Sequence, residues 1–520
     1  MTPRQFHIAV AALFAVAAVL WFTHLGDTAL RVNAEIRAHE ITRTMIETGD
    51  YLMPYYEGDE RVNKPPLLYW VSIASARLTG EFTLFDLRIP SVLSALGLLG
   101  IVLAWTRLLG MPRGRSLLAM GLFLAMYDVT LHARRGGFEM LMSFFAAATV
   151  YACARAAMSD RPRPWGYAAL AGFALGFLTK ATPMLLLVPA VVGPWLVMAG
   201  RGRELRRPRV WVMSAVALLI GLSWHIFAIM FSEEVREHIL GAALLPFGVK
   251  TAQAVGATHY EPPWFFLVTI WKTTVPVCFL LPLAALFVWR RRGFEPSSPW
   301  RLLLLAVVVP FVGFSLLPQK RDDYILPTYP YLVLITAQAV AWGLEELRGR
   351  ARLLVTVPPV LVGAVMGVFV LVGPIGLGWA ADWPLVAAAL FGLTMAGALA
   401  ALVRAMRARR VRTVAAAAFT GIALVWWWYF GVIRYYEDGF GSGHIWAQPG
   451  FDTARWKAKF ERSPVLNDLL DVESGLERLQ KDRFERTGRT LLEHVRTLPP
   501  PPAPTDDTHT TATPPAKVAP

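Results

Sequence analysis

The chain has 520 residues, of which 55% are hydrophobic and only 17% are charged, and its formal net charge is +14. Soluble globular domains are about 45–50% apolar and about 25% charged. The apolar residues here form long uninterrupted runs, which exclude a soluble enzyme, a disordered chain and a disulfide scaffold and predict a polytopic membrane protein. Nucleic-acid binding is not expected, because the positions of the basic residues indicate membrane orientation instead.

About thirteen runs are long and apolar enough, or nearly so, to cross a bilayer as helices. The first run has no small-residue cleavage site after it, so we expect a retained span and not a signal peptide. The segment 65–78 is short and carries Arg77, so we expect it to lie along the membrane face. The predicted spans are 6–23, 89–109, 115–132, 139–158, 166–179, 181–199, 210–231, 264–288, 302–317, 324–343, 353–376, 382–403 and 413–433.

The loops between these runs predict an orientation. With a cytoplasmic N-terminus, alternate loops are rich in arginine, at 113–115, 161–163, 201–209, 290–292, 348–352 and 404–412, as the positive-inside rule requires. The odd number of spans then places the C-terminus outside. We therefore expect a transmembrane domain over 1–433 with a first outward loop at 24–88, a partly helical tail over 434–498, and a disordered Pro-rich tail over 499–520.

Polar residues are concentrated in the first outward loop. Asn33, Glu35 and Arg37 lie close together, and Lys64 directly precedes Pro65-Pro66 and an apolar helix. Proline is tolerated in the first turn of a helix, so Lys64 is expected at the helix entrance, at headgroup depth. A lysine there either extends toward lipid phosphates or binds the phosphate of a lipid substrate, and the spacing leaves both interpretations open.

Further charged residues recur at the outward ends of later spans. Arginine or lysine at the centre of a membrane helix costs about 2.5–3.5 kcal/mol, so these residues belong at the interface or in a polar cavity. Interfacial anchoring explains any one of them, but several on one face with acidic partners favour a binding site. They are Arg134, Arg135 and Glu139, then Lys180, then Lys320, Arg321, Asp322 and Asp323 before Tyr324.

Metal binding has weaker support. No histidine pair shows the His-Glu-x-x-His spacing of zinc proteases. His238, which follows Glu237, is the candidate ligand, with a structural or interfacial role as the alternative.

Several segments resemble those of a known family. Residues 45–51, Met-Ile-Glu-Thr-Gly-Asp-Tyr, followed by 64–70, Lys-Pro-Pro-Leu-Leu-Tyr-Trp, resemble the first outward loop of bacterial ArnT-like and protein-mannosyltransferase-like glycosyltransferases of the GT-C class. Segments 172–183 and 324–330 are similar to further family segments, so the resemblance covers residues 1–345 in order. It implies an all-α GT-C membrane fold with juxtamembrane helices in the first periplasmic loop, located in the bacterial inner membrane.

The resemblance implies an enzyme that moves a pentose or hexose from a polyprenyl-phosphate donor to a lipid, such as lipid A, or to a protein. The reaction is a single displacement at the anomeric carbon with phosphate as the leaving group, which requires cations around that phosphate. Lys64 and Arg37 match family residues at the donor phosphate, as does Tyr324, and Lys320 is a supporting candidate.

The carboxylates depart from the family pattern. The family's Asp-Glu-x-Arg reads Ala34-Glu35-Ile36-Arg37 here, so alanine replaces the usual aspartate, while Glu139 matches an acidic residue expected near the start of the fourth span. Either Glu35 is the catalytic carboxylate, or the acceptor is an ionised group such as a phosphate that needs little base catalysis, or activity is lost. Asn63 replaces a family glutamate and weakens a divalent-metal site built with His238.

Two other classes compete with this interpretation. A transporter or flippase for the same lipid would also need basic residues at headgroup depth, but the chain lacks the internal repeats of many transporters. A non-catalytic scaffold would bind a periplasmic partner through the amphipathic segment 472–498.

Overall fold

The computed structural model describes residues 1–232, with short gaps at 28–29, 31–32, 57–58 and 62–63, residues 261–358, and isolated helical positions between 360 and 426. All of them belong to the unit Met1–Gly441. The predicted tails over 434–498 and 499–520 lie outside the described residues. The same holds for most of the predicted spans 353–376, 382–403 and 413–433.

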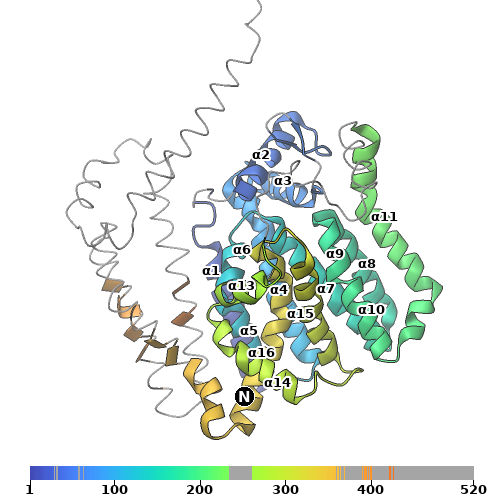
Figure 1. The fold of residues 1–520 in the computed structure, drawn as a ribbon. Coiled ribbons are helices and arrows are strands. Elements are labelled where there is room, and N and C mark those ends of the chain that lie inside the picture. Colours follow the sequence, from blue (N-terminus) through green and yellow to red (C-terminus); the bar gives the residue numbers. More distant parts are fainter. Residues whose placement is uncertain are drawn as a thin grey trace, which may run out of the picture. The chain divides into compact units, whose positions relative to one another are not determined.

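The described part of the chain is built mainly from helices (Figure 1). In chain order its elements are α1 (Pro3–Phe22), α2 (Asn33–Thr48), β1 (Tyr55–Tyr56), β2 (Asp59–Glu60), α3 (Leu67–Thr79), α4 (Leu84–Leu108), α5 (Arg113–Ala125), α6 (Tyr127–Ala133), α7 (Phe138–Met158), α8 (Pro162–Thr179), α9 (Ala181–Leu187), α10 (Pro189–Met198), η1 (Gly202–Arg206), α11 (Pro208–Phe231), α13 (Phe265–Thr273), η2 (Val277–Leu280), α14 (Leu281–Arg290), α15 (Pro299–Leu316), η3 (Asp322–Thr328), α16 (Tyr329–Glu346) and η4 (Gly349–Arg352).

Within the described ranges, seven segments are long and apolar enough to cross a membrane, or up to nine if each of two bent helix pairs is one span. The fold is therefore that of a polytopic helical membrane protein, as the composition predicted. The predicted span 166–179 coincides with α8, which is not one of the seven, so the total of about thirteen stays a prediction. The seven segments are Pro3–Phe22, Leu84–Leu108, Phe138–Met158, Ala181–Met198, Pro208–Phe231, Pro299–Leu316 and Asp322–Glu346.

Two predicted spans are broken helices. The span 115–132 divides into α5 and α6, bent by 65°, and 264–288 divides between α13 and the η2–α14 segment, bent by 115°. The two breaks meet, because the backbone N–H of Tyr127 donates to the carbonyl of Val275 at 2.9 Å. An unpaired backbone group is costly in an apolar environment, so each break helps to satisfy the other. A continuous run of apolar residues in the sequence does not reveal such a hydrogen bond between two helix breaks.

The first outward loop forms a small cap of its own. Strands β1 and β2 pair antiparallel, with Tyr55 opposite Glu60. The cap shares a second hydrophobic core with the helices, to which α2 contributes Ile41, α3 Leu68, α7 Phe138 and α11 Trp224. The helix predicted over 65–78 is present as α3, and its position along a membrane face stays a prediction. This packing fixes the entrance of α3 against the N-terminal end of α7.

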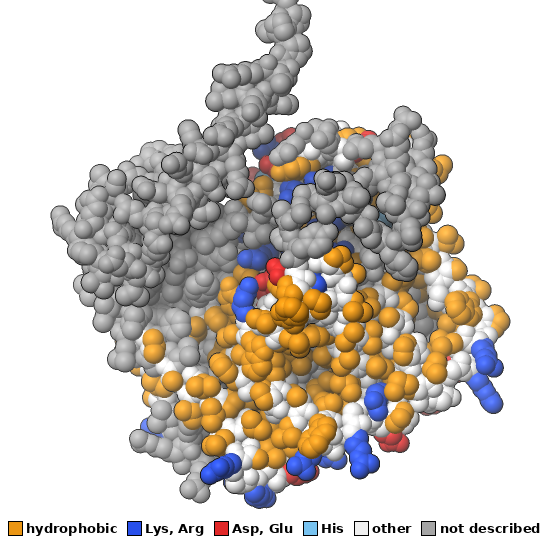
Figure 2. All heavy atoms as spheres, in the orientation of Figure 1, with side chains coloured by type: hydrophobic (Ala, Val, Ile, Leu, Met, Phe, Trp, Pro, Cys, Tyr) orange, Lys and Arg blue, Asp and Glu red, His pale blue; other side chains and the backbone are white. Residues whose placement is uncertain are grey.

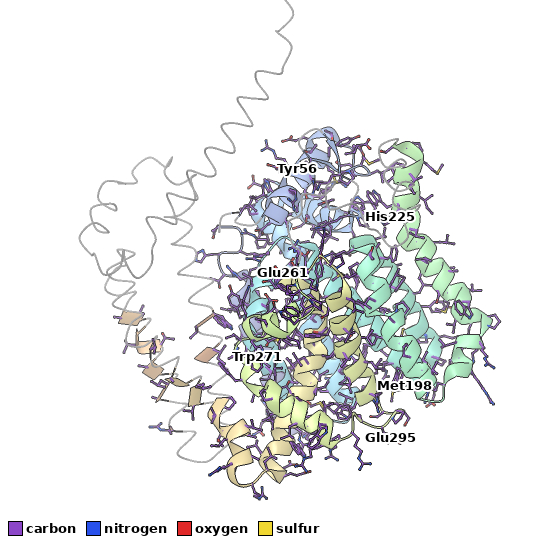
Figure 3. All side chains as sticks on the ribbon, in the orientation of Figure 1. Tyr56, Met198, His225, Glu261, Trp271 and Glu295 are labelled. Carbon is purple, nitrogen blue, oxygen red and sulfur yellow. The ribbon has the colours of Figure 1, made fainter. Side chains whose placement is uncertain are left out.

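The molecule presents a broad hydrophobic face with Lys and Arg side chains along its lower edge (Figure 2). Tyr56, in the cap, lies at the upper end, whereas Met198 at the end of α10 and Glu295 before α15 lie at the lower end (Figure 3). The arginine-rich loops that flank Met198 and Glu295 therefore lie at the end opposite the cap. The cap contains Glu35, Arg37 and Lys64, three of the candidate site residues that the sequence analysis selected.

Candidate active site

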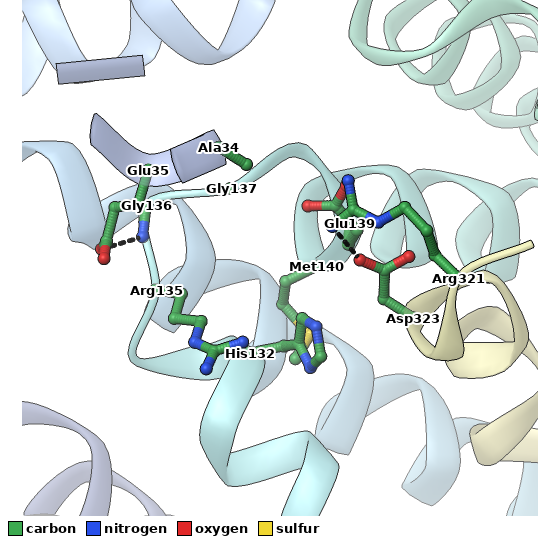
Figure 4. A pocket seen from close by; sticks show the side chains of 10 residues that line it. All are labelled: Ala34, Glu35, His132, Arg135, Gly136, Gly137, Glu139, Met140, Arg321 and Asp323. Carbon is green, nitrogen blue, oxygen red and sulfur yellow. Dashed lines mark hydrogen bonds and ion pairs between the residues drawn. The ribbon is translucent and has the colours of Figure 1, made fainter. Parts of the chain in front are cut away.

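A pocket with about 360 Å³ of empty space brings together α2, α6, the start of α7 and the start of η3 (Figure 4). Three carboxylates and several cationic groups share it. Its lining residues are Ala34, Glu35, His132, Arg135, Gly136, Gly137, Glu139, Met140, Arg321 and Asp323.

Glu35 is held in place by a buried ion pair. Its Oε1 accepts a hydrogen bond of 2.8 Å from Nε of Arg88 and one of 2.7 Å from the backbone N–H of Gly136. Arg88 also donates to the carbonyl of Leu25 at 2.7 Å. Buried charges need such complete pairing, because an uncompensated charge is strongly destabilising. The geometry therefore gives Glu35 a positioning role in the wall of the pocket, and its predicted role as base stays a prediction.

Gly136 is required by a close approach. A Cβ atom at this position would lie 2.4 Å from Cγ of Leu87. Only glycine lets the chain pass Leu87 and still present its N–H to Glu35. The α6–α7 connection is thereby fixed in the geometry that places Glu139 in the pocket.

Two lysines from distant segments lie around Glu139. Nζ of Lys180, from the junction of α8 and α9, lies 3.5 Å from Oε1 of Glu139 and 5.0 Å from the ring centre of Tyr324. Nζ of Lys64 lies 4.5 Å from the ring centre of Phe138, the neighbour of Glu139. The structure thus brings together Lys64, Glu139, Lys180 and Tyr324, all of which the sequence analysis singled out.

The electrostatics of Lys64 reflect this crowding of cations. The pKa of the Lys64 ammonium is lowered to about 8, mainly by burial and also by the charges of Lys180, Arg321 and Arg37, while the charge of Glu139 acts in the opposite direction. An ammonium whose charged form is disfavoured in this way gains from the arrival of an anion. The cluster is therefore suited to binding a negatively charged group such as a phosphate.

Asp323 is a site residue that was not selected from the sequence. Its Oδ2 accepts a hydrogen bond of 2.5 Å from the guanidinium of Arg321. Its Oδ1 is buried and has no hydrogen-bond partner among the described residues, as is also true of Oε1 of Glu139. The signal in the sequence was the charged run 320–323 before an apolar helix, and from this run we selected Lys320.

His132 also reaches the pocket, through the bend between α5 and α6. Its Nδ1 lies 3.0 Å from the carbonyl oxygen of Asp128, one helical turn earlier, and 3.3 Å from Oδ1 of the same residue. The Tyr329 hydroxyl donates to Oδ2 of Asp128 at 3.0 Å. The i, i+4 spacing of Asp128 and His132 was visible in the sequence, but their place in the site follows from the bend.

Other predicted residues lie elsewhere. Lys320 is only 3% exposed, and its Nζ donates to the carbonyl of Glu261 at 2.5 Å, so Arg321 and not Lys320 lines the pocket. Asn63 and His238 lie outside the described residues. Among the residues that the structure describes, no group of three or more metal-ligating side chains is present, and the role of His238 stays a prediction.

The fold and the site define a polytopic helical membrane protein with a polar pocket and a cluster of cationic side chains around Glu139. Residues 63–227 match the family of dolichyl-phosphate-mannose-protein mannosyltransferases. The chain is 29% identical over 337 residues to the undecaprenyl phosphate-alpha-4-amino-4-deoxy-L-arabinose arabinosyl transferase of Shewanella sediminis, covering 63% of this chain and 59% of that protein. It is 31% identical over 325 residues to the same-named protein of Aeromonas salmonicida, covering 61% and 57%. The chain thus spans less than two thirds of the length of these curated relatives.

Solved structures agree with these sequence similarities. Crystal structures of ArnT from Cupriavidus metallidurans, apo and bound to undecaprenyl phosphate, match with TM-scores of 0.63 and 0.64 at 20% identity. The matches cover 82% and 83% of this chain and 77% of ArnT. The chain therefore shares its fold with ArnT. These similarities agree with the resemblance to ArnT-like and protein-mannosyltransferase-like glycosyltransferases that the sequence motifs predicted.

Proposed function

We propose that this chain is a membrane glycosyltransferase that moves a sugar from a polyprenyl-phosphate donor to a lipid acceptor at the periplasmic face of the bacterial inner membrane. The observation that carries the proposal is the placement of Lys64 and Lys180 around Glu139, beside a pocket of about 360 Å³. Cations fixed before the reaction stabilise the negative charge that develops on a departing phosphate.

In this proposal the two lysines bind the phosphate of the donor, and Arg37 adds its charge to the same field. Tyr324, whose ring faces the Lys180 ammonium, bounds the phosphate position. The acceptor oxygen attacks the anomeric carbon while the bond from that carbon to the phosphate oxygen breaks. Glu139 directs Lys180 at the reaction centre, because its carboxylate lies 3.5 Å from the Lys180 ammonium, and its negative charge acts on Lys64 as well.

The names of the relatives support the donor and acceptor classes. The Shewanella and Aeromonas proteins are named as transferases of an aminoarabinose carried on undecaprenyl phosphate, which favours a pentose on a polyprenyl phosphate for this chain. A lipid A-like acceptor accords with an enzyme of the inner membrane. A cytoplasmic N-terminus accords with the arginine-rich loops lying at the end opposite the cap.

Mass spectrometry of envelope lipids from cells with and without the chain tests the proposal. We expect one envelope lipid to lose the mass of one sugar when the chain is absent, and Lys64→Ala to reproduce that loss. Lys272→Ala is the matched control, because Lys272 is exposed and paired with Asp322 at 2.8 Å, outside the pocket. Accumulation of polyprenyl-phosphate sugar on the cytoplasmic side with no change in any acceptor would favour the transporter instead.

A further inference from the structure

The pocket contains three carboxylates, and their surroundings separate their roles. Oε1 of Glu35 is engaged by Arg88 and by the N–H of Gly136. Glu139 is the counter-ion of Lys180, at 3.5 Å, so it lies with the cations that receive the donor phosphate. A group that takes a proton from the acceptor must instead contact the attacking atom, which in a single displacement approaches the anomeric carbon from the side opposite the phosphate.

Asp323 provides a buried acceptor oxygen inside the pocket. It is 4% exposed and lines the pocket. Arg321 fixes its orientation by donating to Oδ2 at 2.5 Å, while Oδ1 has no partner within the described ranges. A buried carboxylate oxygen without a protein donor is rare in folded proteins, and its donor is a water molecule or a ligand.

We propose that Asp323 is the general base of the transfer and that the acceptor nucleophile is a hydroxyl group, an inference that rests on the proposed glycosyltransferase function. The acceptor O–H places its hydrogen on Oδ1. As the acceptor oxygen bonds to the anomeric carbon, the bond to the phosphate oxygen breaks, the proton passes to Oδ1 and the phosphate leaves with the electron pair. An acceptor that is already ionised has no proton to give and requires no such base.

Four charged groups act on Asp323. Arg321 contacts it directly, and the others are Lys180 at the α8–α9 junction, Glu139 from α7 and His132 from α6. Two carboxylates in one cavity do not ionise with equal ease, an arrangement that commonly separates an acid–base group from a permanently charged one.

The test compares Asp323→Asn with Asp322→Asn in the purified full-length chain, reconstituted in vesicles with a polyprenyl-phosphate sugar and the lipid acceptor. Asp322 is the matched control because its side chain is 46% exposed and paired with Lys272. Two quantities are measured for each protein, the equilibrium binding of the donor and the rate of sugar transfer as a function of pH. Asp323→Glu is the conservative variant.

We expect Asp323→Asn to bind the donor as the wild type does and to transfer sugar about 10²–10⁴-fold more slowly, without the wild-type rise of rate with pH. Asp322→Asn should match the wild type, and Asp323→Glu should recover part of the rate and its pH dependence. The inference would be overturned if Asp323→Asn transferred sugar at the wild-type rate or lost donor binding. It would also be overturned if the sugar were found linked to the acceptor through a phosphate oxygen. Failure of the wild type to transfer to any acceptor would instead refute the proposed function.

Discussion

Lys64 gives a quantitative prediction for donor binding as a function of pH. With its pKa at about 8, the ammonium is about 90% protonated at pH 7 and about 10% protonated at pH 9. The phosphodiester of the donor keeps one negative charge throughout this range, so only the protonated lysine binds it well. The apparent dissociation constant scales with the inverse of the competent fraction, and donor binding should therefore weaken about tenfold between pH 7 and pH 9.

The assay is equilibrium binding of a polyprenyl-phosphate sugar to the purified chain in detergent from pH 6 to pH 10. Lys64→Arg is the matched control, because a guanidinium stays charged across this range and should give a much flatter curve. An unchanged wild-type affinity between pH 7 and pH 9, or the same weakening in Lys64→Arg, would refute the reasoning.

The lowered pKa of Lys64 also affects the stability of the fold, and this effect depends on pH in the opposite direction to donor binding. The folded pKa is lowered from 10.5 to about 8, so between these two values the unfolded chain binds more protons than the folded chain. The contribution of Lys64 to stability is therefore least favourable below pH 8 and improves as the pH rises toward 10.5. The fall in donor binding above pH 8 is thus not a consequence of unfolding at this group.

Three further predictions concern the walls of the site. Arg88→Ala leaves the buried Glu35 carboxylate without its counter-ion and should destabilise the fold by about 3–5 kcal/mol, measured as a fall in the thermal unfolding temperature in detergent. Gly136→Ala places a Cβ 2.4 Å from Cγ of Leu87 and should cost about 1–3 kcal/mol in the same assay, partly recovered by adding Leu87→Ala. Lys320→Met should lower thermal stability but leave donor affinity unchanged, because the ammonium is bound to a backbone carbonyl outside the pocket.

Each of these three predictions has a control variant or a result that would contradict it. Arg43→Ala breaks an exposed ion pair with Glu47 and should change stability by less than about 1 kcal/mol, so an equal effect of Arg88→Ala would contradict the buried-pair interpretation. A Gly136→Ala protein as stable as the wild type would show that Leu87 moves freely. A donor-binding defect in Lys320→Met would restore Lys320 to the phosphate site.

The sequence predicted those features that depend on composition and local order. Long apolar runs gave the membrane class and most helix positions, since a helix must satisfy its own backbone in lipid and so needs about 20 apolar residues. Motif order predicted the resemblance to ArnT-like proteins. The position of Lys64 before Pro65-Pro66 predicted its place at a helix entrance, and α3 begins at Leu67 in the structure.

The parts of the site that the sequence did not predict depend on side-chain contacts between distant segments. Whether Glu35 is a free base or one half of an ion pair depends on Arg88, which stands inside an apolar helix and contacts it only in the folded chain. Lys320 and Asp323 are three residues apart, yet one is bound to the Glu261 carbonyl and the other lines the pocket. Residue type and spacing alone do not determine which way a side chain points in the folded chain.

Sugar transfer by the purified chain tests the central claim most directly. The full-length protein in vesicles would receive a polyprenyl-phosphate pentose and an extract of envelope lipids, and the products would be weighed by mass spectrometry. The account predicts that one lipid gains the mass of one pentose with the wild type and not with Lys64→Ala. Vesicles in which the donor is bound or moved across the bilayer while no lipid gains a sugar would contradict it.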